Sequence, residues 1–230
     1  MITLSVGDVL ERAWALTKKF GIKLALLFLL FYIVIGGLAY VATPTDQVVS
    51  LQPHTALSAE ELLAGFTWAN LVISILSFVF SIGIYTAALR MTRGSEENIQ
   101  ISDFVKPFTF YVKLFAMSLL VVIIVGTGLV LLVLPGIYLL VRLIWAQFYL
   151  IENPEASISE SISASWKATE GKELTLLLIG IVAFFVSISG VVLCCIGFFY
   201  TLQIYVFALA VTFSLLFPVL RSPFPYTRGR

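Results

Sequence analysis

The chain alternates between long apolar runs and shorter polar segments, and this alternation predicts its architecture. A helix needs about 20 apolar residues to cross a hydrocarbon core about 30 Å thick. The apolar runs predict transmembrane helices at residues 24–42, 66–89, 108–134, 137–151, 174–195 and 196–220. We therefore expect an all-α fold, in which residues 1–230 form a single integral membrane domain. This domain is a polytopic, six-transmembrane-helix bundle with cytoplasmic amphipathic helices.

The fourth run, residues 137–151, is the shortest of these segments. As an α-helix it would be about 22 Å long, which is less than the thickness of the hydrocarbon core. It follows Leu134-Pro135-Gly136, a sequence that predicts a turn inside the apolar region. We expect this turn to lie below the lipid headgroups, and the pattern leaves open whether the span crosses fully.

The polar segment 5–20 has a helical pattern of its own. Ser5 and Asp8 resemble a capping box, and apolar residues follow at helical spacing. Trp14, Lys18 and Lys19 are typical of a helix that lies among lipid headgroups. The pattern predicts an interfacial helix that Trp14 anchors.

The segment 154–170 predicts a second interfacial helix. Ile158, Ile162 and Trp166 recur at i, i+4 and i+8, which places them on one face of a helix. Serine, glutamate and lysine residues occupy the opposite face. We expect the three apolar residues to anchor this helix at the cytoplasmic membrane interface.

The ends of this second helix have recognisable capping residues. Asn153 stands where an N-cap residue would stand, and Pro154 follows at a position where its missing N–H has no cost. Gly171 stands where a left-handed glycine would end the helix.

The composition agrees with a lipid environment. Hydrophobic residues make up 60% of the 230 residues and charged residues 12%, whereas a soluble domain is about half apolar and about a quarter charged. The net charge of +1 gives no reason to expect nucleic acid as a partner. Residues 24–42 are longer than the apolar part of a usual signal peptide, so we expect an uncleaved first span.

The positions of lysine and arginine predict the orientation. With six spans, all of these residues except Arg142 fall on the same side of the membrane: Arg12, Lys18, Lys19, Lys23, Arg90, Arg93, Lys106, Lys113, Lys167, Lys172, Arg221, Arg228 and Arg230. Because such residues accumulate on the cytoplasmic side, we expect both the N-terminus and the C-terminus to be cytoplasmic.

The polar residues form no pattern typical of a catalytic or metal-binding site. His54 is the only histidine, and the adjacent Cys194 and Cys195 cannot join distant elements. No lysine lies deep in a span, and the carboxylates gather in the polar segments. We therefore expect no enzyme activity, no catalytic residue, no metal and no cofactor.

Arg142 is the only charge deep in a predicted span. An arginine at the centre of a membrane costs about 2.5–3.5 kcal/mol on insertion scales, so it should have a partner. The candidates are backbone carbonyls beside Pro135-Gly136, the side chains of Gln147, Gln203 and Tyr205, and a lipid phosphate. Three roles stay open: a structural contact, an anionic headgroup or substrate site, and pairing with an acid on a partner subunit.

A longer pattern surrounds Arg142. Pro135-Gly136 precedes it, Glu152 closes the span, and a helix with Ala164-Ser165-Trp166 follows. Together with Gly7-Asp8-Val9-Leu10, this pattern resembles bacterial six-helix membrane proteins, among them the membrane domain of some glycerophosphodiester phosphodiesterases and the YciC-like inner-membrane proteins. The resemblance implies the six-helix fold and a location in the bacterial inner (plasma) membrane. It implies no activity, because the catalytic domain of those phosphodiesterases is a separate soluble barrel.

These observations favour a non-catalytic integral membrane protein, either an accessory or scaffold subunit or a lipid-interacting factor. The alternative is a small transporter for an anionic or lipid-like solute centred on Arg142. The expected partners are membrane lipids and other membrane-protein subunits.

Overall fold

The computed structural model describes residues 4–42, 68–94, 99–100, 103–192 and 195–218. These residues form seven helices and no strand: α1 Val6–Ala42, α3 Trp68–Thr92, α4 Phe108–Leu131, α5 Val133–Glu152, α6 Ile158–Thr169, α7 Glu173–Val192 and α8 Cys195–Leu216. All of them except α6 are long and apolar enough to cross a membrane, six helices in the described residues. The predicted all-α, six-span fold is confirmed.

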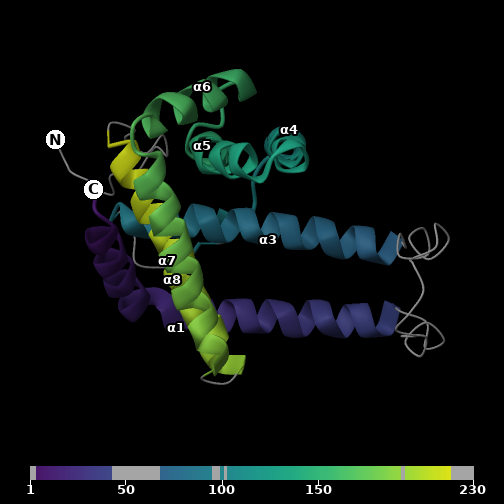
Figure 1. Ribbon diagram of the computed structural model, residues 1–230. Helices are drawn as coiled ribbons and strands as arrows, with labels where there is room; N and C mark the ends of the chain where they lie inside the picture. Colours follow the sequence, from purple (N-terminus) through teal and green to yellow (C-terminus); the bar gives the residue numbers. More distant parts are fainter. Residues whose placement is uncertain (1–3, 43–67, 95–98, 101–102, 193–194, 219–230) are drawn as a thin grey trace, which may run out of the picture.

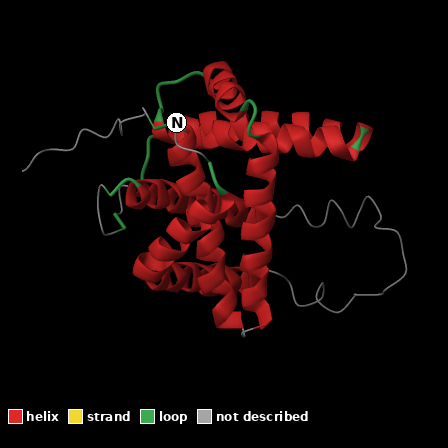
Figure 2. Ribbon diagram, turned by 60° about the vertical axis from the view of Figure 1, so that its left-hand side comes forward, coloured by secondary structure: helices red, strands yellow, loops and turns green. Residues whose placement is uncertain are grey.

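The helices form three pairs that cross one another at steep angles (Figures 1 and 2). The pairs are α1 with α3, α4 with α5, and α7 with α8, and α8 also packs against α1 and α3. Most of the side chains of α8 after Phe199 are buried. A helix that is apolar on all sides can occupy such a central position because every face meets another apolar surface.

Residues 6–42 form one helix, α1, instead of a separate interfacial helix followed by a span. Figure 1 shows its first turns, in dark purple, at an angle to the rest. Val9, Ala13 and Thr17 are fully buried at the spacing of one helix face, while Trp14 is 45% exposed. The amphipathic pattern of this segment therefore reflects packing against the protein as well as an outward-facing polar side.

The chain reverses between α4 and α5 at Leu132, which has extended backbone angles. The predicted turn at Leu134-Pro135-Gly136 lies instead inside the first turn of α5. Pro135 is tolerated there because the first N–H groups of a helix have no intrahelical partner. Span four therefore covers Val133–Glu152, 20 residues or about 30 Å of helix, which is enough to cross the core.

Gly128 and Gly136 let α4 and α5 approach closely just beside this reversal. A Cβ atom built on Gly136 would lie 2.6 Å from the backbone nitrogen of Leu129, and one built on Gly128 would lie 3.0 Å from the Cα of Gly136. No side chain fits at either position without moving the backbone. The Pro-Gly sequence thus allows tight packing of the hairpin rather than making the turn.

Helix α6 begins later than the sequence pattern predicts. Asn153 caps the end of α5, and its N–H donates to the carbonyl of Tyr149 at 2.8 Å. The N-cap of α6 is Ser157, which accepts from the N–H of Glu160 at 3.1 Å, and the Glu160 carboxylate accepts from the Ser157 N–H at 3.4 Å. Gly171 has φ +73°, which confirms the left-handed glycine predicted after this helix.

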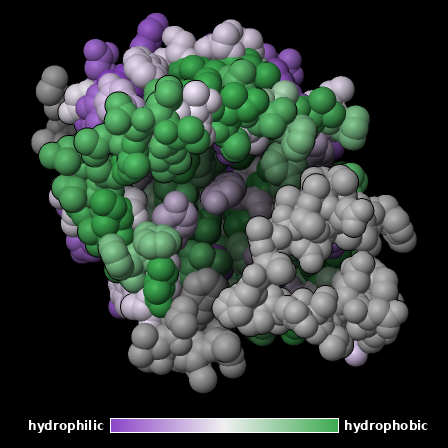
Figure 3. All heavy atoms as spheres, turned by 45° about the vertical axis from the view of Figure 1, so that its right-hand side comes forward, coloured by the Kyte–Doolittle hydropathy of each residue, from purple (hydrophilic) through white to green (hydrophobic). Residues whose placement is uncertain are grey.

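Large apolar side chains are exposed on α1, α3, α4, α5 and α7. In Figure 3 they spread over much of one face, and hydrophilic side chains concentrate towards its upper edge. Such a surface suits a lipid environment. The predicted outer loop with His54 and the side chains of Cys194 and Cys195 lie outside the described part of the chain.

Candidate functional site

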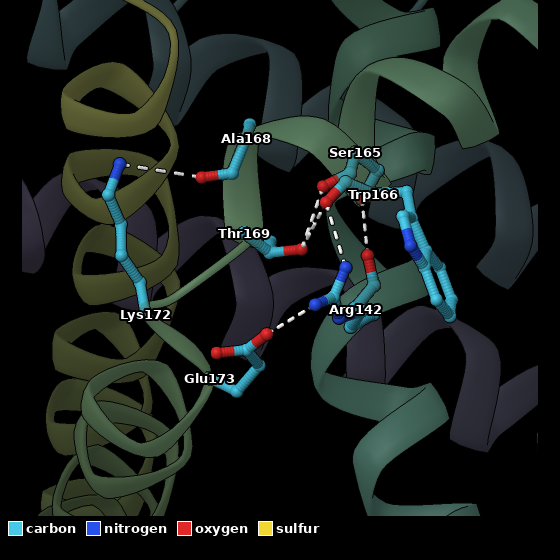
Figure 4. A network of polar contacts seen from close by, with 7 residues as sticks. All are labelled: Arg142, Ser165, Trp166, Ala168, Thr169, Lys172 and Glu173. Atoms are coloured by element: carbon cyan, nitrogen blue, oxygen red, sulfur yellow. Dashed lines mark hydrogen bonds and ion pairs between the residues drawn. The ribbon is translucent and has the colours of Figure 1, made fainter.

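Arg142 lies where α5, α6 and α7 meet (Figure 4). It is 5% exposed. Its Nη1 donates to the carbonyl of Trp166 at 3.1 Å, and its Nη2 forms an ion pair with the carboxylate of Glu173. Its Nε is buried without a hydrogen-bond partner. The charge that the sequence places inside a span therefore has an acid of its own chain beside it.

Two aromatic rings enclose the guanidinium group. Its central carbon lies 5.1 Å from the ring centroid of Tyr138 and 4.4 Å from that of Trp166. Tyr138 precedes Arg142 by one helical turn, so both project from the same face of α5. A cation over an aromatic face is stabilised by about 0.5–2 kcal/mol, with the larger values where water is excluded.

A stripe of small hydroxyl residues on α6 is buried next to this cluster. Ser161, Ser165 and Thr169 are each 0% exposed, at i, i+4 and i+8. Ser165 Oγ donates to the carbonyl of Arg142 at 2.5 Å. Small side chains let two helices approach closely, and this stripe is the face through which α6 packs against α5.

The apolar residues predicted to anchor α6 are less buried than this stripe. Ile158 and Ile162 are partly buried against the core, and Trp166 is 39% exposed. Their contact with a membrane interface stays a prediction, as does that of Trp14. The sequence pattern identified the amphipathic helix but not the side that faces the protein.

The side chains proposed as partners of Arg142 lie elsewhere. Gln203 is fully buried, and its Nε2 donates to the carbonyl of Phe199 at 3.1 Å. Tyr205 lines an apolar groove, and Gln147 is partly buried on α5. Within the described residues none of the three bonds to Arg142, whose contacts are with Trp166, Glu173 and Tyr138.

Glu173 was missed because it stands in a polar segment far from Arg142 in sequence. One signal could have identified it: it directly follows Gly171-Lys172 and opens an apolar helix. An acid in the first turn of a helix is favoured by the helix dipole. It can therefore be held at the end of a span, within reach of a neighbouring helix.

An apolar groove of about 460 Å³ lies between α5, α7 and α8. A groove of this size falls within the range of about 300–1,000 Å³ typical of ligand sites. Its lining is Leu140, Val141, Ile144, Trp145, Leu176, Leu177, Ile179, Gly180, Ile181, Phe184, Phe185, Tyr205 and Leu209. Val141 is next to Arg142, and Leu176 lies one helical turn after Glu173, so the charged cluster lies at one end of the groove.

Two further arginines join the ends of other helices. Arg93 forms an ion pair with Glu152 at 2.8 Å and donates to the carbonyl of Phe217 at 3.4 Å, which connects the ends of α3, α5 and α8. Arg90 pairs with Asp103 at 3.1 Å. The first pair thus connects three helix ends, and the second holds the polar segment before α4 against the end of α3.

Near these arginines, burial lowers the pKa of the Lys106 amine, while Asp103 raises it and Arg90 lowers it to smaller extents.

In the described ranges, no three His, Cys, Asp or Glu side chains gather as metal ligands would. The chemistry that the site offers is thus a charged, partly aromatic cluster beside an apolar groove.

No protein-family model, no curated protein and no solved structure matches this chain. The likeness to bacterial six-helix membrane proteins stays a prediction from the sequence pattern. The functional argument below therefore depends on the geometry of the groove and the charged cluster.

Proposed function

We propose that this chain is a non-catalytic integral membrane protein that interacts with membrane lipids, as a lipid-interacting factor or as an accessory or scaffold subunit. The observation that supports it best is the groove between α5, α7 and α8, which has a volume of about 460 Å³ and an almost wholly apolar lining. In a bilayer, such a surface offers hydrocarbon chains a better fit than a smooth helix face because of its larger contact area.

We also propose a location in the bacterial inner membrane with both termini in the cytoplasm. The basic residues near the ends of the helices support this orientation: Arg90 and Arg93 at the end of α3, Lys113 near the start of α4, and Lys167 and Lys172 around the end of α6. Lysine and arginine accumulate on the cytoplasmic side of membrane proteins, so the ends of the helices that carry these residues are expected to face the cytoplasm.

The alternative function, a small transporter for an anionic or lipid-like solute centred on Arg142, has less support. Glu173 forms an ion pair with the guanidinium group, and Trp166 provides a backbone acceptor. An anion would have to compete with this carboxylate for the same N–H groups. A buried arginine that already has an acid partner is better suited to holding helices together than to attracting a solute.

Native mass spectrometry of the protein, purified in a mild detergent, tests the proposal. We expect a stoichiometric phospholipid to remain bound after most detergent is removed. A stoichiometric protein partner in the same sample would support the subunit form of the proposal. A bare protein mass, with neither a lipid nor a partner, would contradict it.

A further inference from the structure

The groove has a buried floor and an exposed rim. On the floor, Trp145 is 3% exposed, Leu176 4%, Ile179 1% and Leu209 5%. The rim includes Leu140, Ile181, Phe184 and Phe185, which are 43–66% exposed. These rim residues belong to the apolar surface of helices long enough to span a membrane. The groove therefore opens sideways towards the hydrocarbon of the bilayer.

The volume of the groove matches one hydrocarbon chain. A methylene group is similar in size to a water molecule, whose share of the liquid volume is about 30 Å³. A cavity of about 460 Å³ therefore holds roughly 15 methylene groups, which is one long acyl chain and not a whole two-chain lipid.

Polar groups lie at the end of the groove where α7 begins. Glu173 is the first residue of α7, and Lys172, which is exposed, precedes it. The Lys172 amine makes one long hydrogen bond, 3.4 Å, to the carbonyl of Ala168 (Figure 4). Arg142 and Glu173 neutralise each other in their ion pair, so the exposed Lys172 provides the positive charge next to the start of α7. This end suits a negatively charged phosphate.

We infer that the groove binds one acyl chain of a bilayer phospholipid, with the phosphate of that lipid beside Lys172 at the start of α7. The inference rests on the proposed lipid interaction and adds its location and the class of ligand. The acyl chain comes from a bilayer phospholipid because the groove opens along a lipid-facing surface. The acyl chain can enter sideways while the headgroup of the same lipid stays at the interface.

Gly180 provides a way to close the groove. It lines the groove in the middle of α7, and a Cβ atom built on it would meet no heavy atom within 4 Å. A leucine at this position can therefore extend into the part of the groove that the acyl chain would occupy, without a clash at its Cβ. Gly126 on α4 is also free of neighbours within 4 Å and does not line the groove. Gly126→Leu is thus the matched control, and both substitutions favour the helix over glycine.

The experiment uses fluorescence of Trp145, which lies on the groove floor. Trp14, Trp68 and Trp166 are changed to Phe, so that Trp145 remains as the single tryptophan. The protein is reconstituted in phosphatidylcholine vesicles with or without phosphatidylcholine brominated in its acyl chains. We expect bromine to quench Trp145 in the parent and in Gly126→Leu, and most of that quenching to be lost in Gly180→Leu. Equal quenching in all three proteins would overturn the groove assignment.

Two further measurements complete the test. If Gly180→Leu does not give folded protein by circular dichroism, Gly180→Ala replaces it, with a partial loss expected relative to Gly126→Ala. Native mass spectrometry of the parent distinguishes a phospholipid from a free fatty acid as the source of the acyl chain. A fatty-acid mass instead of a phospholipid mass would overturn the phospholipid assignment. Phospholipid retained equally by Gly180→Leu and Gly126→Leu would overturn the groove site and leave the proposed function standing. A parent with no bound lipid would overturn the groove site, and a parent with neither a bound lipid nor a protein partner would contradict the proposed function itself.

Discussion

Arg142 on α5 and Glu173 on α7 form an ion pair although 31 positions separate them in sequence. Helix α6 makes this possible by folding back along α5. Its 12 residues return the chain by about 18 Å, and Arg142 lies about 15 Å before the end of α5. The two lengths nearly match, so the first residue of α7 arrives at the depth of Arg142.

The same arrangement explains how a charge is accommodated inside an apolar helix. The apolar side chains that α5 exposes, such as Leu134 and Leu140, precede Arg142, and the later part of the helix is covered by other helices. Helix α6, which covers it, exposes Glu160 and Lys167. Arg142 therefore lies beside a helix with a polar outer face, so it avoids the full cost of a charge in hydrocarbon.

Removal of Glu173 should be more harmful than removal of Arg142. The Arg142 side chain is 6% exposed and that of Glu173 27%, so Glu173→Ala leaves a buried charge, whereas Arg142→Met leaves a carboxylate that water still reaches. We expect Glu173→Ala to lower the free energy of unfolding by about 2–3 kcal/mol, less than the 3–5 kcal/mol of fully buried pairs. Arg142→Met should cost about 1 kcal/mol or less, because apolar packing replaces the ion.

Unfolding in mixed micelles with increasing dodecyl sulfate measures both effects. The double variant Arg142→Met/Glu173→Ala is the control, and it should be more stable than Glu173→Ala alone, because no buried charge remains. Equal costs for the two single variants would show that the ion pair is not the main contribution of either residue.

The outer face of α6 should be accessible to water. Ser163 is exposed on this face, and a cysteine there should react with a maleimide that does not cross membranes, in a background with Cys194 and Cys195 changed to Ala. Val122, 65% exposed near the middle of α4, provides the control, since Val122→Cys should stay unreactive in hydrocarbon. Equal labelling of both positions in sealed inside-out vesicles, whose cytoplasmic face is outermost, would show that α6 does not present its polar face to water.

The capping box of α6 predicts that substitutions of Ser157 and Glu160 destabilise the protein, although both side chains are exposed. Ser157→Ala removes the acceptor for the Glu160 N–H and should cost about 1 kcal/mol. Glu160→Lys should also destabilise, by roughly 0.5–1 kcal/mol, because it removes the reciprocal bond and puts a cation at the helix N-terminus. Ser163→Ala, at an exposed position on the same helix, is the control. The comparison uses thermal unfolding, and three equal midpoints would contradict the cap.

The close packing of α4 and α5 makes two glycines behave in opposite ways. Gly136→Ala would place a Cβ 2.6 Å from the Leu129 backbone nitrogen and should cost about 1–3 kcal/mol, as overpacking does. Gly126→Ala meets no neighbour and should stabilise α4 by up to about 1 kcal/mol. The melting temperatures of the two variants in the same detergent check this, and a stable Gly136→Ala protein would contradict the tight hairpin.

The sequence was sufficient to predict where the helices lie along the chain, but not which side chains of different helices contact one another. Hydrophobic runs located the six helices that can span a membrane, because length and apolarity are local properties. The partner of Arg142 depended on the path of α6, because an acid that opens an apolar helix, as Glu173 does, does not by itself indicate which neighbouring helix it meets. The reversal at Leu132 was also missed, since Pro135 and Gly136 are common in turns but serve here in the first turn of a helix and in close packing. Likewise, the N-cap was assigned to Asn153 because the sequence offers two capping residues only four positions apart.

The orientation of the whole chain can be tested with reporter fusions. The positive-inside rule predicts that residues 1–23, 90–113, 152–173 and 221–230 are cytoplasmic. A phosphatase reporter, active only outside the cytoplasm, should therefore be active after Gln52 and inactive after Glu97. A fluorescent reporter that matures only in the cytoplasm should give the opposite result at the same two positions. Because one helix, α3, lies between these positions among the described elements, both fusions reporting the same side would exclude α3 as a full span and with it the six-span topology.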